Sequence, residues 1–129
     1  MALVEKTVND RTLISENGIA IGAAAAVVTT SHVIRSLKPN FEIPNRRISV
    51  AVKVSAAVNA GTRVGLFGSF EEGGAIVPVQ AAIFGASAPG ITWSYATVDL
   101  NASPMPFYFI GITAAADDSA KTLDMVVSE

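Results

Sequence analysis

The alternating pattern of residues 48–55 constrains the fold of this chain more than any other feature of its sequence. Isoleucine or valine occupies positions 48, 50, 52 and 54, and serine, alanine or lysine occupies the positions between them. Side chains two residues apart project from the same face of a β-strand, so this pattern predicts a strand with one buried face. Residues 59–61, Asn-Ala-Gly, predict a turn into a second extended segment over residues 62–70, which completes a hairpin.

Further extended segments recur at the spacing expected of an antiparallel β domain, each bounded by turn-forming residues. Residues 17–18, Asn-Gly, predict a tight hairpin between short strands at 12–15 and 19–21. Four consecutive alanines within residues 22–28 favour a helix as a minor alternative, because the segment is too short to be stable alone. The remaining segments predicted as strands are 27–37, 75–84, 91–100, 107–113 and 121–127.

We therefore expect an all-β fold, either an antiparallel β-sandwich or a jelly-roll-like domain of about eight short strands. The 129 residues match the length of one domain, which we expect to span residues 11–129. Residues 1–10 carry no strong strand pattern, and we expect them to form an extended amino-terminal arm that docks on a neighbour. Residues 39–47 contain two prolines and are expected to form a loop.

The hydrophobic content indicates that this domain needs a companion molecule. Half of the residues are hydrophobic and only 16% are charged, so polar groups are too few to cover an ordinary surface. Residues 76–84 and 106–112 are apolar on both faces of the predicted strand, so each second face should be covered. A closing loop or the amino-terminal arm could cover it, but we favour a neighbouring subunit because few residues remain for a third layer. The chain has no cysteine, which excludes disulfides and thiolate metal sites.

Charge is unevenly distributed along the chain. Residues 1–63 hold eight basic and four acidic side chains, a balance of +4, whereas residues 64–129 hold one basic and seven acidic side chains, a balance of −6. One interpretation is that strands from the two halves pair within one subunit; the other is head-to-tail contact between subunits. The net charge of −2 does not favour direct binding of nucleic acid. The apolar run at 18–28 is too short for a membrane span and lacks the basic flank of a signal peptide, so we expect neither membrane insertion nor secretion.

Motifs that would carry catalysis or bind a cofactor or metal are not apparent. His32 is the single histidine and has no motif around it, and no Gly-x-Ser-x-Gly sequence is present. The acidic pairs at 71–72 and 117–118 are adjacent in sequence, so their side chains point apart or into solvent, and the second pair lacks the spaced ligands of a calcium loop. We expect the glycines at 65 and 68 to permit a bulge or a close backbone approach rather than to bind phosphate. We predict no catalytic residues, no cofactor and no metal site.

Aromatic and arginine side chains are the candidates for contact with another molecule. Trp93 and Tyr95 share a strand face and suit a platform for a sugar or a partner, with packing in the core as the competing interpretation. Arg46 and Arg47 form the only basic pair, which suits a solvated loop or a bidentate bond to an acidic neighbour. The candidate interface residues are Phe107, Tyr108, Phe109, Trp93, Tyr95, Arg46 and Arg47.

The whole chain resembles the small all-β virion proteins of tailed bacteriophages, in particular the decoration or cement proteins of the outer capsid shell. The cysteine-free composition, the abundance of alanine, glycine, valine and threonine, the short strands, and the ending over residues 107–113 and 121–129 carry the resemblance. The resemblance implies clamping of neighbouring capsid subunits, commonly as a homotrimer. It also implies the major capsid protein as partner and the virion, assembled in the host cytoplasm, as location. No diagnostic motif is matched, so no residue role is carried over.

Other functions remain as alternatives at this point. A coat, adaptor or tail component would share the same setting. A carbohydrate-binding β-sandwich module would use Trp93 and Tyr95 against sugar rings. An enzyme ranks last, because the sequence offers no nucleophile or metal motif.

Overall fold

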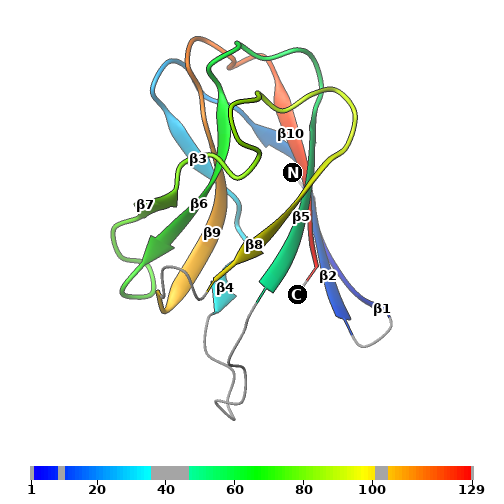
Figure 1. Cartoon of the computed structure of the whole chain (residues 1–129), viewed down its shortest axis with the longest axis vertical. Helices are drawn as coiled ribbons and strands as arrows, with labels where there is room; N and C mark the ends of the chain where they lie inside the picture. The colour runs from blue at the N-terminus through cyan, green and yellow to red at the C-terminus, as the bar shows by residue number, and fades with distance from the viewer. Residues whose placement is uncertain (1, 9–10, 36–46, 101–104, 129) are drawn as a thin grey trace.

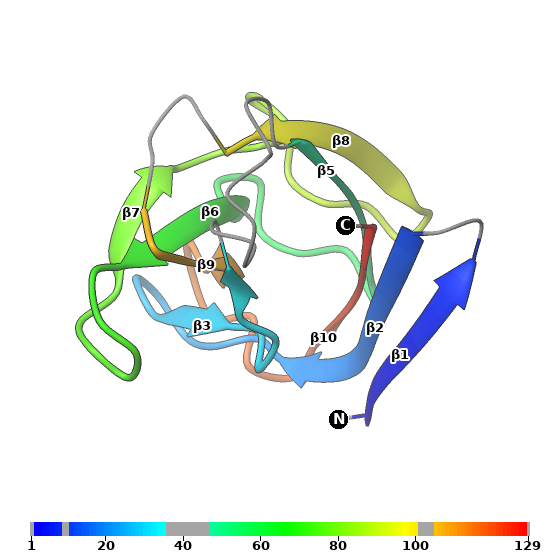
Figure 2. The same cartoon turned by 90° about the horizontal axis from the view of Figure 1, so that it is seen from below.

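The fold is all-β, with two antiparallel sheets that face each other as a sandwich (Figures 1 and 2). A computed structural model describes residues 2–8, 11–35, 47–100 and 105–128, and these residues form ten strands and no helix. Sheet A has the strand order β1-β2-β10-β5-β8, and sheet B has the order β3-β9-β6-β7, with β4 also paired to β9. The strands are β1 (Ala2–Val8), β2 (Arg11–Ala20), β3 (Val27–Thr29), β4 (Ile34–Arg35), β5 (Arg47–Val54), β6 (Arg63–Ser69), β7 (Val77–Gln80), β8 (Ser94–Asp99), β9 (Phe107–Thr113) and β10 (Thr122–Ser128).

The core lies between the sheets and follows the predicted alternation. Strand β5 buries every second residue, and its alternate side chains lie on the outer face of sheet A. Strands β9 and β10 show the same period of two, because each lies inside its sheet with one face toward the opposite sheet. The fully buried side chains of this core include Ile34, Ile48, Val50, Val52, Leu66, Tyr108, Ile110, Ile112, Leu123 and Met125.

Strands from the two halves of the chain pair with each other, which confirms the intrachain interpretation of the charge distribution. Strand β10 lies between β2 and β5, and β9 pairs with β3, β4 and β6. In sheet A the register places Arg47 opposite Asp99 and Lys53 opposite Asp124. Opposite charges on directly facing strand positions are favourable, so the uneven charge of the sequence supports strand pairing.

The Asn17-Gly18 dipeptide forms a β-bulge, and the predicted hairpin at this position is wrong. Strand β2 continues through it, and the register with β10 shifts between Leu123 and Met125. Gly18 takes a φ of 68°, and its N–H donates to Oδ1 of Asp124 at 2.9 Å. A glycine with positive φ is found in β-bulges as well as in tight turns. The local sequence therefore could not distinguish a bulge from a hairpin turn at this position.

Residues 22–28 contain no helix. A turn occupies this segment, with Ala25 at a φ of 63°, and β3 begins at Val27. The predicted strand over residues 27–37 becomes two short strands, β3 and β4, which both pair with β9. The predicted strand over residues 75–84 is reduced to β7.

Residues 2–8 belong to sheet A within the chain, and the expectation that the amino-terminal residues dock on a neighbour stays a prediction. Ala2–Val8 forms β1, paired with β2 from Ala2 opposite Asn17 to Val8 opposite Arg11. Figure 2 shows β1 at the edge of the sheet, beyond β2. The side chains of residues 3–6 are all exposed, so these four positions show no alternation of buried and exposed residues and leave no periodic signal in the sequence.

Candidate interaction surface

The outer face of sheet B carries an apolar groove. Its strands β3, β9, β6 and β7 direct alternate side chains away from the core, and the register brings Val27 opposite Thr113 and Phe67 opposite Pro78. We call this surface the sheet B groove, and its volume is about 420 Å³. A second hollow of about 210 Å³, beside Arg63 and Ala81, shares three of the lining residues. The residues that line the sheet B groove are Val27, Thr29, Phe67, Ile76, Pro78 and Thr113.

Two facing glycines in sheet B allow neighbouring groups to approach the backbone closely beside the sheet B groove. Gly65 and Gly111 face each other on β6 and β9. The ring of Phe67 lies over Gly111, where an added Cβ would be 2.7 Å from Cε2 of the ring. The backbone of Gln80 approaches Gly65 so closely that a Cβ there would lie 2.8 Å from its carbonyl oxygen. The glycine at 65 therefore permits a close backbone approach, as predicted, and an aromatic ring covers the gap at 111.

The aromatic segment of β9 divides between the core and this outer face. Tyr108 is fully buried, and its hydroxyl accepts from the N–H of Met105 at 2.7 Å and donates to the carbonyl of Leu100 at 2.8 Å. The prediction of Tyr108 as an interface residue is therefore wrong, because its side chain lies on the face of β9 that points into the core. Phe107 and Phe109 are half-buried on the opposite face, and Phe109 lies opposite Phe67.

Trp93 and Tyr95 lie outside the core, on the outer side of sheet A near its β8 edge. Their exposed fractions are 37% and 77%, so the interpretation of these residues as core packing is wrong. Nζ of Lys53 lies 4.9 Å from the centre of the Trp93 ring, within cation–π range. Arg47 is exposed at the start of β5, and Arg46 lies outside the described residues.

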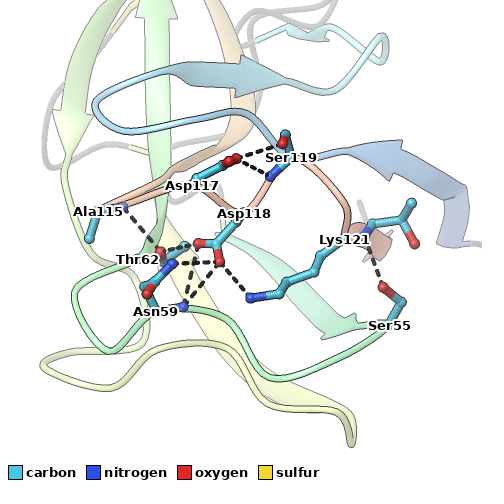
Figure 3. Close-up of polar contacts among 9 residues, drawn as sticks. Ser55, Asn59, Thr62, Ala115, Asp117, Asp118, Ser119 and Lys121 are labelled. Carbon is cyan, nitrogen blue, oxygen red and sulfur yellow. Dashed lines mark hydrogen bonds and ion pairs between the residues drawn. The ribbon is translucent and has the colours of Figure 1, made fainter.

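A polar cluster surrounds Asp118, in the connection between β9 and β10 (Figure 3). Its buried carboxylate accepts from Nδ2 of Asn59 at 2.8 Å, from Oγ1 of Thr62 at 2.7 Å and from Nζ of Lys121 at 2.9 Å. The N–H of Asn59 donates to the same carboxylate at 3.2 Å. These bonds join the β5–β6 connection to the β9–β10 connection. Protein donors occupy both oxygens, so this buried carboxylate links the two connections.

The two neighbouring aspartates of this connection have different surroundings. Burial raises the pKa of Asp118, but the hydrogen bonds described above outweigh burial, and the pKa lies below its ordinary value of 3.8. The carboxyl of Asp117 is exposed, and the hydroxyl and the N–H of Ser119 lower its pKa by donating to Oδ1. Both groups are therefore held in the ionised form that their hydrogen bonds favour.

Glu16 is a fully buried carboxylate that the sequence interpretation missed. Its two oxygens each accept from the N–H of Ser31 at 3.0 Å, and Oε1 also accepts from the N–H of His32 at 3.2 Å. These bonds attach the β3–β4 connection to β2. Glu16 lies two residues after the buried Ile14 in β2, so both side chains point to the same face of the strand. This spacing is the signal that could have identified Glu16 as buried.

The described part of the chain shows no group of three or more His, Asp or Glu side chains arranged to hold a metal ion. Across the same residues, no helix has the length and hydropathy needed to cross a membrane. No family model matches the chain, and no curated protein matches it.

Proposed function

We propose that this chain is a non-enzymatic structural protein that works as a subunit of a larger assembly. The sheet B groove carries the proposal, because it combines outward apolar side chains with a concave shape. Val27 and Ile76 on its walls are 48% and 42% exposed, and Phe107 and Phe109 extend the same face. Contiguous apolar surface of this kind is typical of protein interaction sites.

The polar groups of the domain support a scaffold rather than a catalyst. The buried carboxylates of Asp118 and Glu16 are bound to donors from neighbouring connections. A clamp between subunits needs a stable domain and complementary surfaces, and it needs neither proton transfer nor a cofactor.

Within this class we propose a capsid decoration or cement protein of a bacterial virus, which binds the major capsid protein on the outer shell. The resemblance of the sequence to such proteins supports the decoration role. The hydrophobic composition of the chain and the exposed sheet B groove support it too. A coat, adaptor or tail component uses the same kind of surface. Co-sedimentation with undecorated shells of the accompanying capsid protein tests the decoration role. Failure to bind these shells, together with spontaneous growth into larger particles, would favour a coat protein.

The oligomeric state of the purified chain tests the assembly proposal. We expect native mass spectrometry and size-exclusion chromatography with light scattering to detect a small closed homo-oligomer. Replacing Val27 and Ile76 with serine should shift this oligomer toward monomer at equal concentration, while Ile91→Ser should leave it intact. Ile91 is a matched control because it is exposed, apolar and outside the groove lining. A wild-type chain that stays monomeric at high concentration contradicts the proposal.

A carbohydrate-binding module is the second candidate, and the exposed Trp93 and Tyr95 favour it. Aromatic rings with polar tips suit sugar faces that are half solvated. The neighbouring hollow on sheet A, about 170 Å³ in volume, includes Tyr95 and Ala51 in its lining. Binding on a glycan array that Tyr95→Ala and Trp93→Ala abolish, but Ile91→Ser preserves, would support this candidate. The absence of glycan binding would remove it.

A further inference from the structure

Strand β1 is attached to the domain in an unusual way. It pairs with β2 along its whole length and makes no comparable contact with any other strand. The side chains of residues 3–6 are all exposed, and Leu3 and Val4 have exposed fractions of 51% and 52%. Two apolar residues therefore lie at exposed positions of this strand, and none of the side chains at residues 3–6 contributes to the core. Such an element is held mainly by backbone hydrogen bonds and opens at lower cost than a packed strand.

We propose that β1 is an exchange strand, which in the assembled protein pairs with β2 of a second copy of this chain. The inference rests on the proposed function, since it requires that the chain assembles. Its central observation is the β1–β2 register, which extends over seven facing pairs from Ala2 opposite Asn17 to Val8 opposite Arg11. The β2 edge of another copy has the same complementary surface, so exchange preserves every one of these pairs. The β2 edge is the edge with which the structure shows β1 to pair.

The connection and the exposed residues both favour exchange. In sequence only residues 9 and 10 join the facing pair Val8 and Arg11, and short connections of this kind promote exchange between protomers. Leu3 and Val4 project from opposite faces of β1, so a second subunit packed against one face would cover one of them, a burial that the monomer lacks.

Engineered disulfides test the exchange, and the natural absence of cysteine makes them unambiguous. Val4 faces Ser15 across β1 and β2, so Val4→Cys and Ser15→Cys place two thiols at facing positions. The two single variants are unfolded, mixed, refolded together and oxidised. We expect a disulfide-linked dimer on non-reducing gels of the mixture and its loss in either variant alone. Val4→Cys mixed with Thr12→Cys is the control, because Thr12 is three positions along β2 from Ser15 and on the other face.

Three disulfide results would contradict the exchange of β1, and the oligomeric state tests the proposed assembly separately. A chain with both Val4→Cys and Ser15→Cys that forms only a monomeric disulfide, while native mass spectrometry still detects an oligomer, overturns exchange and retains assembly. A dimer formed by Val4→Cys alone indicates pairing between free β1 edges and also overturns it. An equal dimer band in the Thr12→Cys control means random oxidation and removes the support. A chain that is monomeric throughout overturns both proposals.

Discussion

The hydroxyl of Tyr108 offers the sharpest test of how the two sheets are held together. It accepts from the N–H of Met105 and donates to the carbonyl of Leu100, so one buried group joins the two ends of the β8–β9 connection. Arrangements of this kind, in which a buried tyrosine near the start of a strand binds backbone upstream, recur in β-sandwich domains. Tyr108→Phe removes the oxygen and leaves the ring in place.

The expected cost follows from the two backbone groups that lose this partner. At about 1–2 kcal/mol for each of the two groups, the lower part of the range for a buried donor or acceptor left unsatisfied, we expect Tyr108→Phe to lower the free energy of unfolding by about 2–4 kcal/mol. Domains of ordinary stability unfold with about 5–15 kcal/mol, so the loss is a large fraction of the total. It corresponds to a fall in Tm of about 6–20 °C for a domain of this size.

Urea denaturation followed by far-UV circular dichroism measures this loss. The chain contains one other tyrosine, Tyr95, whose side chain is 77% exposed. Tyr95→Phe removes the same atom at the surface and should change the free energy of unfolding by less than about 0.5 kcal/mol. Equal effects of the two substitutions would refute the argument that the buried hydroxyl joins the two ends of the β8–β9 connection.

Two further predictions concern the bulge and the acidic cluster. Gly18→Ala should destabilise the domain by about 1–2 kcal/mol because residue 18 has positive φ. Gly90→Ala should be nearly neutral in thermal unfolding, because residue 90 has no positive φ and an added Cβ there would be 4.0 Å from its nearest neighbour, the Thr92 nitrogen. Because the folded pKa of Asp118 is below 3.8, its carboxylate stabilises the domain above that pH, and this contribution should disappear as pH falls through the folded pKa. An NMR titration that places the Asp118 pKa above 3.8 would contradict the second prediction, and equal effects of the two alanines would contradict the first.

The parts of the fold that depend on one strand at a time were predictable from the sequence. The period of two in residues 48–55 identified β5 and its buried face, and the segments at 107–113 and 121–127 match β9 and β10 closely. The alternation of side chains between the two faces of a strand also applies to β8. Val98 is buried, and Tyr95 has the opposite parity, so an outward orientation of Tyr95 could have been inferred.

Features that depend on pairing between distant segments were not predictable in the same way. The Asn17-Gly18 dipeptide becomes a bulge because β10 pairs with β2 on both sides of it, with Asp124 receiving the Gly18 N–H from 106 residues away. The packing of the Phe67 ring over Gly111, which faces Gly65 across β6 and β9, likewise depends on segments far apart in the sequence. A single sequence does not specify which strands become neighbours, so it does not specify these sites.

The position of β10 has a consequence for how the domain is built. It is the last of the ten strands in chain order, yet it lies in the middle of sheet A, between β2 and β5. Until it arrives, the β1–β2 ribbon and the β5–β8 ribbon have no connection within the sheet. We expect sheet A to close late in folding, and shortening the chain by this one strand should divide the sheet into two separate ribbons.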